Sequence, residues 1–299
     1  PKTPILTTIA IEGDGYDLIS IDDISFSAMQ DRIRGWERKE GAITLENYIS
    51  TISDNSKVTI FCHDNPDPDA LASALAMSEL FASHGHSSQI VHGGTIEHHQ
   101  NQAMVRELAI PVRRLILDWE ITDLIKESDI IVAVDFHRPG ANNIMPTNCI
   151  PHIIIDHHTV DDSVTADLAM VSSEYSSTSS MVASLLMSSD FAMNSRVATA
   201  LAFGIKTDTL GFTRNFNAVD VRALLWINAW VDKDKLRAIE MPPRSIAALE
   251  SFSNALSDKQ QIDKLILAPV HNLTDRDSLA QIADFLLPTE GIDTVITYG

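Results

Sequence analysis

Short apolar runs alternate with helical stretches through the middle of the chain. Between Val58 and Ile155, runs such as VTIFCH, DIIVAVD and HIIID are separated by segments such as DALASALAMSELFASHG. Near-continuous apolar strands that alternate with helices are typical of a parallel sheet with helices on both faces. The sequence therefore predicts an α/β fold, with one helix that begins at Pro68 or Asp69 and stops at Gly85.

The same pattern divides the chain into four expected parts. The main domain covers residues 51–231, where helical runs complete the alternation. The polar run DKDKLRAIEMPPR predicts a linker over 232–245. A strand, a helix and a strand in IDKLILAPV, DSLAQIADFLL and DTVITYG predict a smaller, unfinished α/β domain over 246–299. Residues 1–50 form an N-terminal extension in which a strand and a helix are expected.

Composition and charge narrow the classes of function. The 299 residues are 44% hydrophobic and 21% charged, which is typical of a folded protein, and 41 acidic against 22 basic residues give a net charge of −19. No diffuse basic surface exists to hold long duplex nucleic acid, whereas a small phosphorylated substrate is compatible. Two cysteines without a CxxC pattern argue against a disulfide framework. Without an apolar run of about 20 residues or a signal-like start, we expect a cytoplasmic protein without a membrane partner.

Residues that bind metals follow three of the predicted strands and one helical run. The set is His63, Asp67, Asp69, Asp135, Asp156, His157, His158 and Asp208. Open parallel sheets bind ligands beyond the carboxyl ends of their strands, so these side chains are expected to converge. Each has a simpler explanation alone, since Asp67 or Asp69 could only cap a helix and His63 could only pack. Three strands that end this way are hard to explain as three accidents.

The donor types indicate the metal and the reaction. Four carboxylates and at least two imidazoles, without a thiolate, suit two adjacent divalent ions. Manganese fits best, with magnesium, cobalt or iron as alternatives, and a structural zinc is disfavoured. Two ions bridged by a carboxylate would activate a shared water and stabilise phosphoryl oxygens. We therefore expect hydrolysis of a phosphate ester or anhydride.

The ordered set HDNPDPDA, VD, DHH, SST and TDT resembles the DHH phosphoesterase superfamily. That superfamily contains RecJ-type nucleases, nano-RNA and pAp phosphatases, cyclic-dinucleotide phosphodiesterases and family II pyrophosphatases. The resemblance covers residues 57–299, of which the last part looks like the beginning of a DHHA1 domain, before its glycine-rich GGGH-type loop. GIKTDTLGFTR and DRDSLAQIADFLL resemble archaeal members with an N-terminal TrkA-N or RCK-like module, so residues 1–50 would be a remnant of that module.

The resemblance also implies roles for individual residues. It implies one metal ion held by His63, Asp67 and Asp135, and a second held by Asp69, Asp135, His157 and Asp208. Asp135 would then be the bridge and a catalytic group. His158 would contact the phosphate or give a proton to the leaving oxygen, and Asp156 would orient an imidazole. Ser177, Thr178 and Thr207 would be supports near the site.

The substrate stays open at this stage. Arg138 and Arg214 are the cations best placed to contact its phosphate, although both could simply be solvated. The favoured reaction is hydrolysis of a short oligoribonucleotide, pAp or a linear or cyclic dinucleotide. The alternatives are a pyrophosphatase or polyphosphatase with the same site, and a nucleotide-sensing regulator with a weakly active core. A homodimer is compatible with either.

Overall fold

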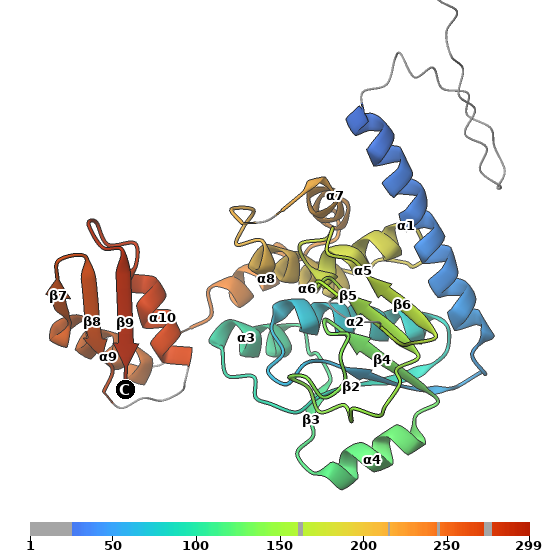
Figure 1. Cartoon of the computed structure of the whole chain (residues 1–299), viewed down its shortest axis with the longest axis horizontal. Helices are drawn as coiled ribbons and strands as arrows, with labels where there is room; N and C mark the ends of the chain where they lie inside the picture. The colour runs from blue at the N-terminus through green and yellow to red at the C-terminus, as the bar shows by residue number, and fades with distance from the viewer. Residues whose placement is uncertain (1–25, 161–163, 215, 244–245, 272–276) are drawn as a thin grey trace, which may run out of the picture.

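The computed structural model describes residues 26–160, 164–214, 216–243, 246–271 and 277–299. Its main sheet is built from six parallel strands, namely β1 (Lys57–Phe61), β2 (Ser87–His92), β3 (Val112–Arg114), β4 (Ile130–Val134), β5 (Ile153–Asp156) and β6 (Leu168–Val171). They lie in the order β3-β2-β1-β4-β5-β6 (Figure 1). The predicted parallel sheet is thereby confirmed.

Helices cover both faces of this sheet. They are α1 (Phe26–Thr51), α2 (Pro68–Ser83), α3 (His99–Glu107), α4 (Asp118–Glu127), α5 (Thr178–Met187), α6 (Ser195–Asp208), α7 (Ala218–Ile227) and α8 (Lys233–Glu240). Alternate residues of β4 face opposite sides: Ile130 and Val132 join the core beneath α2, α5 and α6, whereas Ile131 joins Leu124 of α4. None of the described helices has the length and hydropathy that a bilayer span requires.

The order in which strands are added across the sheet reverses between β1 and β4. From β1 the chain builds β2 and β3 on one side, and from β4 it builds β5 and β6 on the other. Open α/β sheets bind ligands at the carboxyl ends of the strands where the strand order reverses, which here are the ends of β1 and β4. The residues that follow β1, β4 and β5 all meet there.

Helix α2 begins where the sequence predicts. Asp67 is the N-cap, with its side chain accepting from the backbone N–H groups of Asp69 and Ala70, and Pro68 opens the first turn. The helix ends near Gly85, which has a φ of 83°. Most of α2 is buried, between the sheet on one side and α6 on the other. The first turn of α2 is thus fixed on both sides.

Packed helices lie at two places where the sequence predicts a domain boundary or linker, near residue 50 and within 232–245. The last turns of α1 bury Ala42, Leu45 and Ile49 in the core of the main domain, so this helix passes through the boundary expected at residue 50. Within the expected linker, α8 packs against α3 and α6 and buries Ile239. The linker is therefore not extended throughout, because Asp232 caps a helix there. The strand expected before residue 26 lies outside the described residues.

A small second unit has its own sheet and core. It consists of α9 (Ile246–Asp258), β7 (Gln260–Ile262), β8 (Leu265–Pro269), α10 (Asp277–Leu286) and β9 (Thr294–Tyr298). β7 and β8 pair antiparallel and β8 and β9 pair parallel, so the sheet is mixed. Phe252, Ile266 and Ile282 lie in its core. The predicted strand, helix and strand are present, and α9 and β7 are additions to them.

Candidate metal centre

One group of donors forms at the end of β1. The His63 Nε2 atom lies 3.8 Å from Asp67 Oδ1 and 3.6 Å from Asp135 Oδ2. Burial alone would lower the pKa of His63, but the two carboxylates outweigh it and raise the pKa to about 10. Burial alone would likewise raise the pKa of Asp67, yet His63 and two backbone N–H donors lower it. Asp67 therefore caps α2 and faces His63 with the same oxygen.

A second group forms around His157, just after β5. Its Nε2 atom lies 3.9 Å from Asp69 Oδ2, 3.7 Å from Asp135 Oδ1 and 3.5 Å from Asp208 Oδ2. Asp69 comes from the first turn of α2 and Asp208 from the last residue of α6. Four segments distant in sequence thus deliver possible ligand atoms to one point.

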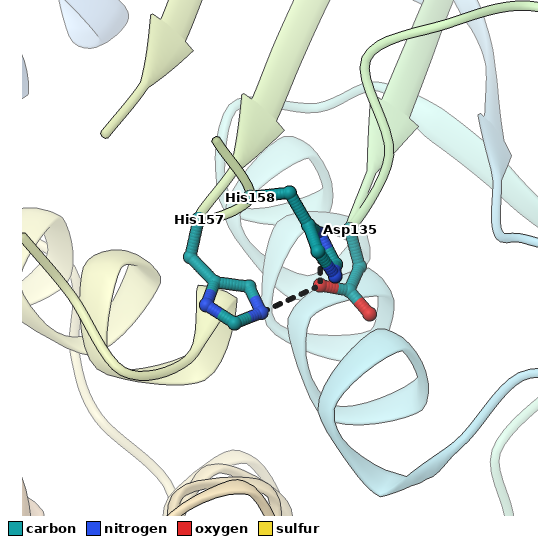
Figure 2. Close-up of side chains that lie close together, drawn as sticks. All are labelled: Asp135, His157 and His158. Carbon is teal, nitrogen blue, oxygen red and sulfur yellow. Dashed lines mark ion pairs between the residues drawn. The ribbon is translucent and has the colours of Figure 1, made fainter. Parts of the chain in front are cut away.

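Asp135 belongs to both groups. Its Oδ2 atom faces His63 and its Oδ1 atom faces His157, and Figure 2 shows His157 and His158 on one side of this carboxylate. The residue is buried, and its φ of 63° lies in the left-handed region that asparagine and aspartate tolerate best among non-glycine residues. The backbone turns sharply after β4, and the carboxylate lies between His63 and His157.

The N-terminus of α5 holds two of these carboxylates in place. The backbone N–H groups of Thr178 and Ser179 donate to Asp69 Oδ2 and Oδ1, each at 2.7 Å. The Thr178 hydroxyl donates to Asp135 Oδ1 at 2.8 Å, while Ser177 caps the helix by accepting from a backbone N–H. The positive end of the helix dipole favours negative charge here. The predicted support by Ser177 and Thr178 has this structural basis.

The carboxylates repel one another strongly. Burial, and then the charge of Asp67, raises the pKa of Asp69 to about 6. Burial and the charge of Asp69 raise the pKa of Asp135 to about 7. Burial and the three neighbouring carboxylates raise the pKa of Asp208 to about 10, against a smaller lowering by Arg214. Such a cluster is complementary to cations.

The geometry of the donors fits two such ions. One group comprises His63, Asp67 and Asp135, and another comprises Asp69, His157 and Asp208, each with ligand atoms within 4.8 Å of one another. Donors that each lie about 2.1 Å from a shared ion are at most about 4.2 Å apart. The imidazole-to-carboxylate distances of 3.5 to 3.9 Å satisfy that limit and are too long for hydrogen bonds. Oxygen and imidazole donors suit manganese or magnesium.

His158 has a different environment from His157. Its Nδ1 atom lies 2.7 Å from Asp156 Oδ1 and 3.9 Å from Asp135 Oδ1, and its side chain is 56% exposed. The Asp156 hydrogen bond, the largest cause, raises the pKa of His158 to about 9. Although His158 also forms a donor group with Asp135 and His157, its Nδ1 is already committed to Asp156. It is therefore better placed to face a substrate than to bind a metal.

His137 is a site residue that the sequence analysis missed. Its Nδ1 atom forms a short hydrogen bond with the second oxygen of Asp156. Burial alone would raise the pKa of Asp156, but the two imidazoles outweigh it and lower the pKa. The available signal was weak, since a single histidine two positions after Asp135 forms no motif.

The remaining predicted residues have mixed positions. The Thr207 hydroxyl donates to the carbonyl groups of Phe203 and Gly204 in its own helix, one residue before Asp208, so its predicted supporting role stays a prediction. Arg214 is exposed and its charge acts on Asp208. Arg138 is exposed in the segment after β4. Arg214 is thereby linked electrostatically to the candidate metal centre.

Residues 57–205 match the DHH family, N-terminal domain. This chain is a member of the DHH family. The matched range contains every residue of the two donor groups except Asp208. The letters DHH are also the sequence of Asp156, His157 and His158 in this chain. The DHH-family assignment thus rests on the segment that also builds the metal centre. The predicted TrkA-N-like remnant in residues 1–50 lies outside this match.

Several known proteins resemble the chain. The uncharacterized protein MJ1633 of Methanocaldococcus jannaschii is 35% identical over 241 residues, which cover 80% of this chain and 49% of that protein. The cyclic-di-AMP phosphodiesterase GdpP of Geobacillus thermodenitrificans is 26% identical over 255 residues, 81% of this chain and 38% of that protein. A protein named "Probable manganese-dependent inorganic pyrophosphatase" from Enterococcus faecalis is 24% identical over 160 residues, 52% and 49% of the two chains. The chain therefore spans about half or less of these relatives.

A solved structure supports the fold. The exopolyphosphatase-related protein of Bacteroides fragilis aligns with a TM-score of 0.66 at 20% identity, over 85% of this chain and 78% of that one. At this identity the likeness concerns the fold alone. It agrees with the parallel sheet and the small mixed-sheet unit described above.

Proposed function

We propose that this chain is a two-metal, manganese-dependent phosphoesterase that hydrolyses small nucleotide phosphodiesters. The observation that carries the proposal is the Asp135 carboxylate, whose two oxygens lie 3.6 and 3.7 Å from the His63 and His157 imidazoles. Both groups of donors therefore share one bridging residue. When bound, two divalent ions supply a water of lowered pKa and neutralise charge on the phosphoryl oxygens.

The side chains around the ions have distinct tasks in this proposal. His63, Asp67, Asp69, His157 and Asp208 hold the ions with Asp135 between them. Because the Nδ1 atom of His158 donates to ionised Asp156, its Nε2 atom remains for the phosphate or the leaving oxygen. A proton donor at that position lowers the barrier for departure of a nucleoside alkoxide. Arg214 adds a cation for the phosphate next to Asp208.

The nucleotide part of the proposal comes from the relatives. GdpP, which carries the name of a cyclic-di-AMP phosphodiesterase, is similar over 81% of this chain. The net charge of −19 favours small substrates over long duplexes. Pyrophosphate is the second candidate, because the Enterococcus faecalis relative is named a pyrophosphatase. One assay separates the two.

The test compares substrates with the full chain and Mn²⁺. Linear and cyclic dinucleotides, pAp and pyrophosphate are supplied at equal concentration, and products are separated by ion-exchange chromatography. We expect dinucleotide cleavage, and a loss of about 1,000-fold or more for Asp135→Asn, since one change weakens both metal positions. Asp232→Asn, a helix-cap change in α8, is the matched control and is expected to keep full activity.

The outcomes divide clearly. Preferential release of phosphate from pyrophosphate would favour the second candidate. Equal turnover by Asp135→Asn and the unchanged chain would rule out the bridging role. Tight nucleotide binding without hydrolysis, with Mn²⁺ present, would instead support a nucleotide sensor.

A further inference from the structure

Two imidazoles share the carboxylate of Asp156. The His158 Nδ1 atom lies 2.7 Å from Oδ1, and the His137 Nδ1 atom forms a short hydrogen bond with Oδ2. The backbone N–H of His158 also donates to Oδ1, at 3.1 Å. Each oxygen of this carboxylate therefore has its own imidazole partner.

Asp156 is held where it can act only through these partners. Its side chain is fully buried at the end of β5, and its carbonyl accepts from the backbone N–H of Ser172 at 3.0 Å. An ionised carboxylate has acceptors only, so both imidazoles present Nδ1–H to it. If His137 were absent, Oδ2 would be a buried acceptor without its imidazole, and the carboxylate would turn toward other donors. The ring of His158 would then lose its fixed orientation.

The two histidines differ in how far they reach outward. The His158 side chain is 56% exposed, whereas that of His137 is 12% exposed. Among the described residues, His137 is also in none of the groups with metal-binding geometry. One ring thus faces the space above the metal centre, and the other supports the shared carboxylate from within the protein.

We infer that His137 is a positioning residue, which acts through Asp156 to hold the His158 ring toward the substrate phosphate. The inference rests on the proposed function, because it concerns how His158 meets a phosphate ester. It assigns His137 no contact with substrate or metal. Loss of a residue that orients a functional side chain in this way lowers activity about 10- to 100-fold.

Four variants of the full chain test this by kinetics. His137→Ala is expected to lower kcat on a dinucleotide about 10- to 100-fold with unchanged Mn²⁺ content. His137→Asn is expected to recover most of that loss, because the asparagine amide nitrogen can take the place of Nδ1 and donate to Asp156. His158→Ala gives the kcat that remains when the contribution of His158 is removed completely. The double variant His137→Ala/His158→Ala is expected to match His158→Ala, since a positioning residue has nothing left to position.

A second readout does not depend on turnover. In the Mg²⁺-loaded protein, proton NMR should show low-field resonances for the two Nδ1–H groups bound to Asp156. The His158 resonance is expected to vanish in His137→Ala through exchange with solvent, and to persist in His137→Asn. Persistence in His137→Ala would overturn the inference, and so would a further kcat loss in the His158→Ala background. An inactive unchanged protein with the expected NMR result would count against the proposed function alone.

Discussion

The candidate metal centre has two unlike halves on either side of Asp135. The outer half, defined by His63 and Asp67, sits at the open end of β1, and the Asp67 side chain is 46% exposed. The inner half, defined by Asp69, His157 and Asp208, includes a carboxylate with no exposure, held by two backbone N–H groups of α5. The contrast lies in the carboxylates Asp67 and Asp69, because the imidazoles of the two halves are exposed to a similar extent, His63 by 15% and His157 by 17%.

The difference concerns how much of each half is organised before a metal binds. Asp69 is fixed by backbone donors that cannot rotate away, and α6 approaches it closely at Gly204. Asp67 also accepts from two backbone N–H groups, but both of these bonds lie within α2 and end on Oδ1, whereas the two bonds to Asp69 hold both of its oxygens. Ligands held by rigid elements bind metals better than ligands that must be ordered first. The inner half should therefore bind its ion more tightly, and the outer half should exchange its ion more readily.

Matched substitutions in the two halves give the largest expected contrast. An asparagine at position 67 keeps an Oδ1 atom that can accept both capping bonds, so Asp67→Asn should weaken Mn²⁺ binding about 10-fold. An asparagine at position 69 has one oxygen for the two N–H groups of Thr178 and Ser179. Its amide nitrogen, itself a donor, would face one of these N–H groups. Asp69→Asn should therefore cost 100-fold or more, about 2.7 kcal/mol.

Titration of Mn²⁺ followed by electron paramagnetic resonance measures both affinities. Asp232→Asn repeats the capping change in α8, away from the site, and should leave the titration unchanged. Equal losses for Asp67→Asn and Asp69→Asn would show that the two halves are equally organised, and would remove the basis of the comparison.

The pH dependence of stability should separate Asp67 from the two buried carboxylates Asp69 and Asp135 by sign. In the metal-free protein the pKa values of Asp69 and Asp135, about 6 and about 7, lie above the ordinary value near 4. Folded protein then binds more protons than unfolded protein, so these groups stabilise fully at low pH and lose that effect as pH rises through 6 to 7. Asp67 has a lowered pKa, so it stabilises the folded protein above the ordinary pKa near 4 and loses that effect as pH falls below it.

Urea unfolding at pH 5, 6, 7 and 8 measures this effect. With chelator present, the free energy of unfolding should fall as pH rises, by at most about 1.4 kcal/mol per pH unit for each group. With Mn²⁺ at about 100 times its dissociation constant, stability should rise by about 2.7 kcal/mol near pH 8, because the ion binds deprotonated carboxylates. Parallel curves with and without Mn²⁺ would mean that these carboxylates do not hold the ion.

The sequence was sufficient for the part of the site that follows strands. β-Branched runs that stop on His63, Asp135 and Asp156 indicate both the strands and their shared edge, because parallel strands end together. The fold class follows from the same alternation. Edge strands were missed, since β3 has three residues, two of them exposed arginines, and shows no apolar run.

Other parts of the site have no sequence signature of their own. Asp69 is held by backbone N–H groups of Thr178 and Ser179, and every residue type carries such a group. His137 reaches Asp156 only because β4 and β5 lie side by side. Such contacts depend on the register of neighbouring elements, which a single sequence does not specify.

A pair of glycines in helices gives the smallest and most local test. A Cβ atom at Gly204 would lie 2.3 Å from Ser179 Oγ, 3.1 Å from Ser179 Cβ and 3.2 Å from Asp69 Cα. Rotation of the serine would relieve the first contact and leave the other two. Gly204→Ala should therefore lower the free energy of unfolding by about 1 kcal/mol or more, despite the higher helix propensity of alanine. It should also weaken Mn²⁺ binding at the inner half.

Gly41 in α1 is the matched control. Its added Cβ would lie 3.4 Å from the nearest atom, on Leu185, which is ordinary contact. Gly41→Ala should therefore raise the free energy of unfolding by about 0.5 to 1 kcal/mol through helix propensity alone. If Gly204→Ala stabilised the protein as much as Gly41→Ala in urea titrations, the inner half would be free to adjust, and its tighter metal binding would need a cause other than packing.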